Sequence, residues 1–145
     1  MTRREILRIL DANFNRSREG LRVCEELLRF VLEDPALTTR IKKIRHDVSG
    51  VLRKLPVSQG ALVSARDVRS DVGKKSSATE KKRVNAIDLF LANIERVKES
   101  LRVLEETAKL VDEAASTEMK KIRFAVYAIE KKALPKLEAL RHHGL

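Results

Sequence analysis

Two aspartates lie four residues apart in a charged stretch near the middle of the chain, Asp67 and Asp71 in the run ARDVRSDVGKK. In proteins Mg²⁺ is usually held by one or two carboxylates together with substrate phosphates, so this pair is a candidate magnesium site. Arg66 adds a cation that could neutralise phosphoryl charge, and Gly73 permits close approach of the backbone to a ligand. The same composition is typical of an exposed charged linker, and the residues alone leave both interpretations open.

A second set of polar residues occurs twice. The segments DANFNRSREGLRVCEELLRF and LANIERVKESLRVLEETAKL begin at residues 11 and 91 and share an Asn, an Arg and a Glu at matching places. These residues are Asn13, Arg16 and Glu19 in the first copy and Asn93, Arg96 and Glu99 in the second. The run KKIR also recurs, which places Arg45 and Arg123 at matching positions further along each copy.

On a helical wheel Asn13 lies at the centre of an apolar face, Arg16 lies within that face, and Arg45 and Arg123 fall on the inward side of their helices. Buried arginine is costly unless it is paired or holds an anion. One interpretation is therefore a pocket between two hairpins in which guanidinium groups bind phosphate in bidentate fashion. The alternative is a network that fixes helix register, with Arg16 paired to Glu19 and its counterpart paired likewise.

The spacing of apolar residues predicts an all-α fold. It indicates one helix from Thr2 to Glu33 and a second that starts at the Asp34-Pro35 cap and runs to about Leu55. A third is expected over roughly residues 78–112 and a fourth over roughly 116–140. The predicted organisation is a four-helix bundle in a single domain, 1–145, with duplicated antiparallel hairpins at 2–55 and 78–141 and a connecting loop at 56–77.

Composition narrows the functional classes. The single cysteine, Cys24, excludes an internal disulfide and a cysteine-based metal site. No apolar run reaches the roughly 20 residues that a membrane span requires, so we expect a cytoplasmic protein. The net charge of +10 favours anionic ligands, but only 3% of the residues are aromatic, which argues against single-stranded nucleic acid.

Familiar phosphate-binding and catalytic motifs are absent from the sequence. It contains no G-x-x-x-x-G-K-[ST], no G-x-G-x-x-G and no H-E-x-x-H. His46 follows Arg45 but points about 100° away from it on a helix, which argues against a general-base role. Phosphate would therefore have to be held by side chains and helix N-termini.

Three separated segments carry a resemblance to a known family: DANFNRSREGLRVCEELLRFVLED with IRHD, ARDVRSDVG, and LANIERVKESLRVLEETAKL. In this order they resemble the small helical hydroxymethylpyrimidine-phosphate kinases of thiamine biosynthesis, which commonly occur fused ahead of a thiamine-phosphate synthase barrel. The resemblance implies phosphorylation of the pyrimidine monophosphate to its diphosphate with ATP and Mg²⁺. The residues to which it points are Asn13, Arg16, Glu19, Arg22, Arg45, His46, Arg66, Asp67, Asp71, Gly73, Asn93, Arg96, Glu99 and Arg102.

We therefore expect an ATP-dependent kinase that acts by positioning and charge neutralisation. Arg16, Arg96 and the second-helix arginines would clamp phosphates, and Asp67 and Asp71 would hold Mg²⁺ or orient the acceptor phosphate. A single composite site is expected, lined by both repeats and closed over by the loop.

Two other functional classes stay open. One is a non-catalytic module that docks on or regulates a thiamine-phosphate synthase, and the other is a nucleic-acid-binding bundle suggested by the net charge. The sequence leaves the oligomeric state open, a homo-oligomer included, and does not show whether the chain acts alone or is part of a longer protein.

Overall fold

The computed structural model describes residues 1–76 and 82–141, and all regular secondary structure in them is helical, which confirms the all-α prediction. The elements are α1 (Arg3–Glu26), a π-helical turn η1 (Leu27–Val31), α2 (Pro35–Lys54), α3 (Gln59–Ala65), α5 (Ala86–Ala108) and α6 (Glu113–Arg141). No helix among these residues is long and apolar enough to cross a membrane.

Side-chain caps fix where the long helices begin. Thr2 and Glu5 form a reciprocal capping box at the start of α1, and the Asn85 side chain accepts the N–H of Asp88 at the start of α5. Asp34 caps α2, with Pro35 in the first turn. The predicted second helix is therefore confirmed to within a residue at each end.

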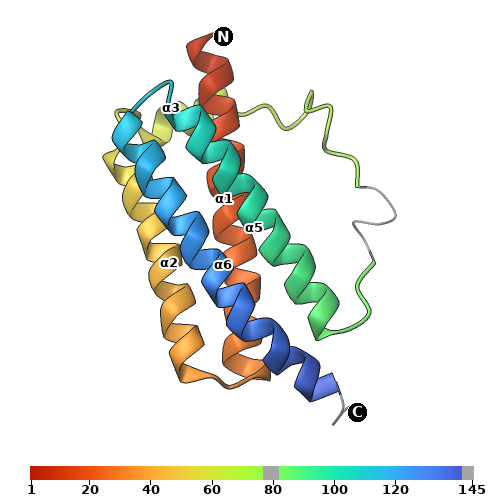
Figure 1. Cartoon of the computed structure of the whole chain (residues 1–145). Helices are drawn as coiled ribbons and strands as arrows, with labels where there is room; N and C mark the ends of the chain where they lie inside the picture. The colour runs from red at the N-terminus through yellow and green to blue at the C-terminus, as the bar shows by residue number, and fades with distance from the viewer. Residues whose placement is uncertain (77–81, 142–145) are drawn as a thin grey trace.

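The four long helices pack side by side (Figure 1), with α1 against α2 and α5, and α6 against the same two helices. α1 and α5 run antiparallel, because Cys24 contacts the Phe90 carbonyl while Gly20 lies against Val97. A Cβ on Gly20 would lie 2.7 Å from Val97 Cγ2, so the absence of a side chain at Gly20 lets the two helices approach this closely.

Three helix boundaries differ from the predicted ones. The first predicted helix does not continue regularly to Glu33: it turns π-helical at Leu27, and Glu33 has a positive φ of 49° that ends it. The third starts at Ala86, because residues 82–85 are not helical; residues 77–81 lie outside the described part. The fourth starts slightly earlier than predicted, at Glu113.

The segment predicted as a loop, 56–77, contains the short helix α3. Ser58 caps it, and Leu62 and Ala65 are buried where it packs on α1. Seven residues offer only two inward positions, too few to form a recognisable apolar stripe.

The length of the connection between α3 and α5 follows from this arrangement. Arg66, at the end of α3, contacts Asp11 in the N-terminal half of α1, whereas Phe90, near the start of α5, lies beside Cys24. Asp11 and Cys24 are about 20 Å apart along α1, so the chain must travel that distance before α5 can begin. In Figure 1 the described parts of this connection, residues 66–76 and 82–85, lie outside the four long helices.

Candidate functional site

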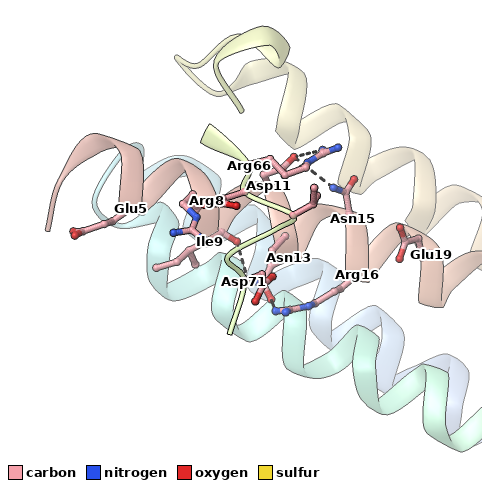
Figure 2. Close-up of a pocket in the computed structure, with 13 residues that line it drawn as sticks. Glu5, Arg8, Ile9, Asp11, Asn13, Asn15, Arg16, Glu19, Arg66 and Asp71 are labelled. Atoms are coloured by element: carbon pink, nitrogen blue, oxygen red, sulfur yellow. Dashed lines mark hydrogen bonds and ion pairs between the residues drawn. The ribbon is translucent and has the colours of Figure 1, made fainter. Parts of the chain in front are cut away.

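A cavity of about 580 Å³ lies between the N-terminal half of α1 and the start of the connection. From α1 it is lined by polar residues that include Arg8, Asp11, Asn13, Arg16 and Glu19. From the connection it is lined by Arg66, Asp67 and Asp71. Figure 2 shows the connection crossing over α1, so the loop and the first repeat are brought together as the sequence predicts.

A bidentate ion pair ties the connection to α1 at one edge of the cavity. Arg66 donates from Nε to Asp11 Oδ2 at 2.7 Å and from Nη2 to Asp11 Oδ1 at 2.8 Å (Figure 2). Asp11 is only 7% exposed, and its hydrogen bond raises the pKa of Arg66. The predicted role of Arg66 in neutralising phosphoryl charge is therefore weakened, since its charge is already balanced by a carboxylate.

Each of the two loop aspartates stabilises a local turn, because one of its carboxylate oxygens accepts backbone N–H groups two or three residues later. Asp67 Oδ1 accepts the N–H groups of Ser70 at 2.9 Å and Arg69 at 3.1 Å, and Asp71 Oδ1 accepts that of Gly73 at 2.9 Å. The bond from Ser70 lowers the pKa of the Asp67 carboxyl, so this group is ionised at neutral pH. The Ser70 side chain also hydrogen-bonds the Asp67 carboxylate, whereas the Oδ2 atom of Asp71 accepts no hydrogen bond from the described residues.

Two aspartates alone offer few ligands for a metal ion. Across residues 1–76 and 82–141 no group of three or more His, Cys, Asp or Glu gathers as a set of metal ligands. Two carboxylates nonetheless fit the chemistry of Mg²⁺, which completes its shell with water and substrate phosphates. Gly73 has no left-handed backbone, and a Cβ there would meet only an ordinary contact, so nothing in the structure requires glycine.

Two arginines in the cavity form no ion pair with a carboxylate of the described residues, although the charge of Arg8 attracts that of Asp67. Arg8 makes no hydrogen bond or ion pair, and Arg16 only reaches Asn13 Oδ1 at the long distance of 3.5 Å. The alternative pairing of Arg16 with Glu19 is not formed. Arg16 is exposed rather than buried as the wheel suggested, but it lines the cavity and is available to an anion.

The second repeat keeps the buried asparagine but does not contribute to this cavity. Asn93 donates to the Leu89 carbonyl at 2.8 Å, as Asn13 does to that of Ile9, so both asparagines satisfy their own helices. Arg96 and Glu99 are exposed, and among the described residues none from α5 or α6 lines the cavity. This cavity therefore differs from the predicted composite site, because the described residues that line it come from the first repeat and from the start of the connection.

The second-helix arginines have structural partners instead of a place at the cavity. Arg123 is 4% exposed and donates from Nε to Glu105 Oε2 at 3.1 Å, and its Nη2 forms an ion pair with the same oxygen at 3.0 Å. Arg45 lies 3.4 Å from Glu25 at the matching place in the first hairpin. The predicted phosphate clamp at these two positions is replaced by ion pairs within each hairpin.

His46 is also remote from the cavity. It is exposed in a separate depression between α2 and α6, which it shares with Arg53 and Lys121. The structure therefore gives it no contact with the loop aspartates.

Sequence reasoning missed Arg8 and Asp11. Arg8 lies outside the matched repeat, so nothing in the pattern marked it. Asp11 is the first residue of the repeat, and the second copy has Leu91 there. A carboxylate that replaces an apolar residue between two otherwise similar copies is the signal that could have identified it.

The helices and the cavity together define an all-α protein with a cavity beside α1 that is lined by charged residues. A family model described as the ThiD2 family matches residues 8–132, and the chain belongs to this family. The matched range contains every cavity residue named above.

The similar curated proteins are longer than this chain. A thiamine-phosphate synthase from Synechocystis sp. is 45% identical over 126 residues, which cover 86% of this chain and 35% of that protein. One from Rhodopirellula baltica is 40% identical over 126 residues, covering 86% and 33%. The chain thus spans about a third of the length of these relatives. No solved structure matches it.

Proposed function

We propose that this protein is a kinase of thiamine biosynthesis that uses ATP to convert hydroxymethylpyrimidine monophosphate to the diphosphate. The observation that carries the proposal is the cavity that has Arg8 and Arg16 on its α1 side and Asp67 and Asp71 on the side of the connection, with no ion pair to either arginine among the described residues. Membership of the ThiD2 family and similarity to thiamine-phosphate synthases support the assignment to this pathway.

The residues suit phosphoryl transfer onto a phosphate. The acceptor is already ionised, so the reaction needs no strong general base and depends on positioning and on neutralised charge. Arg8 and Arg16 would bind phosphate oxygens, and Asp67 and Asp71 would hold Mg²⁺. When bound, Mg²⁺ would neutralise charge on the phosphates between donor and acceptor.

The net charge of the cavity bears on whether a phosphate ligand can bind without a metal ion. Its lining contains three arginines against five Asp and Glu residues, a formal charge of −2. A free polyphosphate would be repelled by this excess, whereas one Mg²⁺ held by the loop aspartates would cancel it and attract the phosphate oxygens. The proposal therefore expects nucleotide binding that depends on the metal.

The test is steady-state release of ADP on adding the pyrimidine monophosphate to protein, ATP and Mg²⁺. Arg16→Ala should lower kcat/KM by about 100-fold, because a charge-assisted contact to phosphate contributes roughly 1.5–3 kcal/mol. Arg96→Ala is the matched control, since it removes the equivalent exposed arginine from the second repeat. The proposal fails if ADP release does not depend on the pyrimidine, or if the two variants behave alike.

We also infer that the four long helices form a bundle that arose by duplication of one hairpin. Two features support this origin. The ion pair of Glu25 with Arg45 has its counterpart in Glu105 with Arg123, and both buried asparagines bond the carbonyl four residues earlier.

A second candidate function is a non-catalytic module that docks on or regulates a thiamine-phosphate synthase. It is favoured by one observation: the similar proteins carry that name and are about three times as long as the matched region. Its signature would be no pyrimidine-dependent ADP release, together with a changed synthase rate when this chain is added. A cytoplasmic location and a homo-oligomeric state stay predictions.

A further inference from the structure

We propose that Asp11 is a positioning residue: through Arg66 it holds the loop aspartates over α1, and it thereby confines the site to the first repeat. The inference deepens the proposed function and rests on it. Asp11 contacts no expected reacting group, and its effect passes through the neighbouring segment.

The first step is the connectivity of the pair. Arg66 caps the end of α3 and is followed at once by Asp67, so fixing the guanidinium fixes the start of the aspartate-bearing turn. Asp11 lies on a long helix and is almost fully buried, and it therefore offers a rigid anchor. Two parallel bonds also set the orientation of Arg66, which a single bond would not.

The second step is that, among the described residues, this pair makes the hydrogen bonds that join the segment to α1, whereas Arg8 of α1 attracts the Asp67 carboxylate without a hydrogen bond. From Arg69 to Lys74 the hydrogen bonds stay within the segment: backbone N–H groups to Asp67 and Asp71, and Lys74 Nζ to the Arg69 carbonyl. The side chains of residues 68–76 are exposed. Between α1 and residues 66–76 of the described chain, the Asp11–Arg66 pair is the hydrogen-bonded tie.

The third step is the support behind Asp11. Asn15 Nδ2 donates to Asp11 Oδ1 at 3.4 Å, and Arg18 Nη2 donates to Asn15 Oδ1 at 3.1 Å. The three side chains follow one face of α1, one turn apart, and orient the carboxylate toward Arg66.

The same three positions do a different task in the second repeat. They are occupied by Leu91, Glu95 and Lys98, and Lys98 bonds Glu95 and also Glu130 of α6 at 2.9 and 3.0 Å. Leucine cannot accept a hydrogen bond, and the charged pair is engaged in packing its own hairpin. The divergence at Asp11 thus accounts for a cavity on α1 that the connection helps to line, whereas the hollow on α5 is lined by residues of α5 and α6 alone in the described chain.

The test examines Arg66→Gln and Asp11→Asn. Arg69→Gln is the control for Arg66→Gln, since it also removes one positive charge from the connection, at an exposed side chain without a partner among the described residues. Hydrogen exchange reports on positioning without any assumption about activity. The two variants of the Asp11–Arg66 pair should speed hydrogen exchange of the Arg69, Ser70 and Gly73 amides by about tenfold or more, while the amides of α1 and α5 stay protected. Arg69→Gln should leave these rates as in the wild type.

Kinetics supply the second readout. Displacement of the aspartates by about 1 Å should lower kcat by roughly 100-fold, with a smaller change in the KM of the pyrimidine, since Arg8 and Arg16 stay in place. If Arg66→Gln and Asp11→Asn leave the exchange rates of these loop amides unchanged, the inference is overturned whatever the activity. Faster exchange with wild-type kcat also overturns it. A wild-type protein without kinase activity refutes the proposed function alone, because exchange still tests the positioning.

Discussion

The two equivalent ion pairs differ in burial, and this difference yields a quantitative prediction about stability. Replacing Glu105 by Gln leaves the Arg123 guanidinium charged, 4% exposed and without a carboxylate. Removing one partner of a buried pair costs about 3–5 kcal/mol, because the remaining charge stays desolvated. Tyr127 still accepts one bond from Arg123 at 2.8 Å, so we expect the lower end, about 3 kcal/mol.

Glu25→Gln is the internal control for the same chemical change. Its partner Arg45 has a side chain that is 23% exposed and lies 3.4 Å away, and it can turn to water when the charge is removed. The expected loss is about 1 kcal/mol, part of it from the exposed Arg22, which also pairs with Glu25.

Urea unfolding of both variants, followed by circular dichroism, measures the two free energies. The reasoning is refuted if Glu105→Gln loses no more stability than Glu25→Gln, or if it loses less than about 1 kcal/mol. A phosphate-clamping role for Arg123 would instead give normal stability and impaired ligand binding, so ligand affinity of the folded Glu105→Gln protein completes the comparison.

Three further predictions concern packing, reactivity and pH. Gly20→Ala should cost about 1–3 kcal/mol through overlap with Val97, and Val97→Ala in the same chain should recover part of this loss in urea unfolding. The Cys24 thiol should not react with Ellman's reagent at pH 8 until the protein unfolds, because burial raises its pKa to about 12 and leaves it fully covered. Asp34→Ala should cost about 1 kcal/mol at pH 7 by removing the cap of α2. Since the N–H of Leu37 lowers the pKa of Asp34, this difference should be present above the unfolded pKa and shrink as pH falls through the folded one.

Local signals in the sequence were sufficient for the second helix and for the buried asparagines. Asp34 and Pro35 act within one turn of the chain, and the apolar neighbours of Asn13 define its face without knowledge of the partner helix. Features of this kind depend only on residues a few positions apart, and they were predicted correctly.

Contacts between distant segments explain what could not be predicted. A helical wheel places Arg16 near the apolar face of α1. It does not show that Arg16 lies at the exposed edge of the contact between α1 and α5. Arg45 and Arg123 were correctly expected to point inward, yet their partners Glu25 and Glu105 lie on other helices. The Asp11–Arg66 pair joins residues 55 positions apart, and although the comparison with Leu91 marks Asp11, it does not indicate which residue Asp11 pairs with.

The close approach of Gly20 to Val97 also determines which hairpins can pair. At the matching positions the first hairpin has Ser17 and Gly20, and the second has Val97 and Ser100. Two copies of the second hairpin would set each valine against a serine, whose Cβ would occupy the space that only glycine leaves empty. Two copies of the first would set serine against glycine and leave a gap that lacks packing contacts. Val97 and Gly20 therefore favour packing of the first hairpin on the second over packing of either hairpin on a copy of itself. The contact between α1 and α5 thus contributes to the specificity of hairpin pairing as well as to packing.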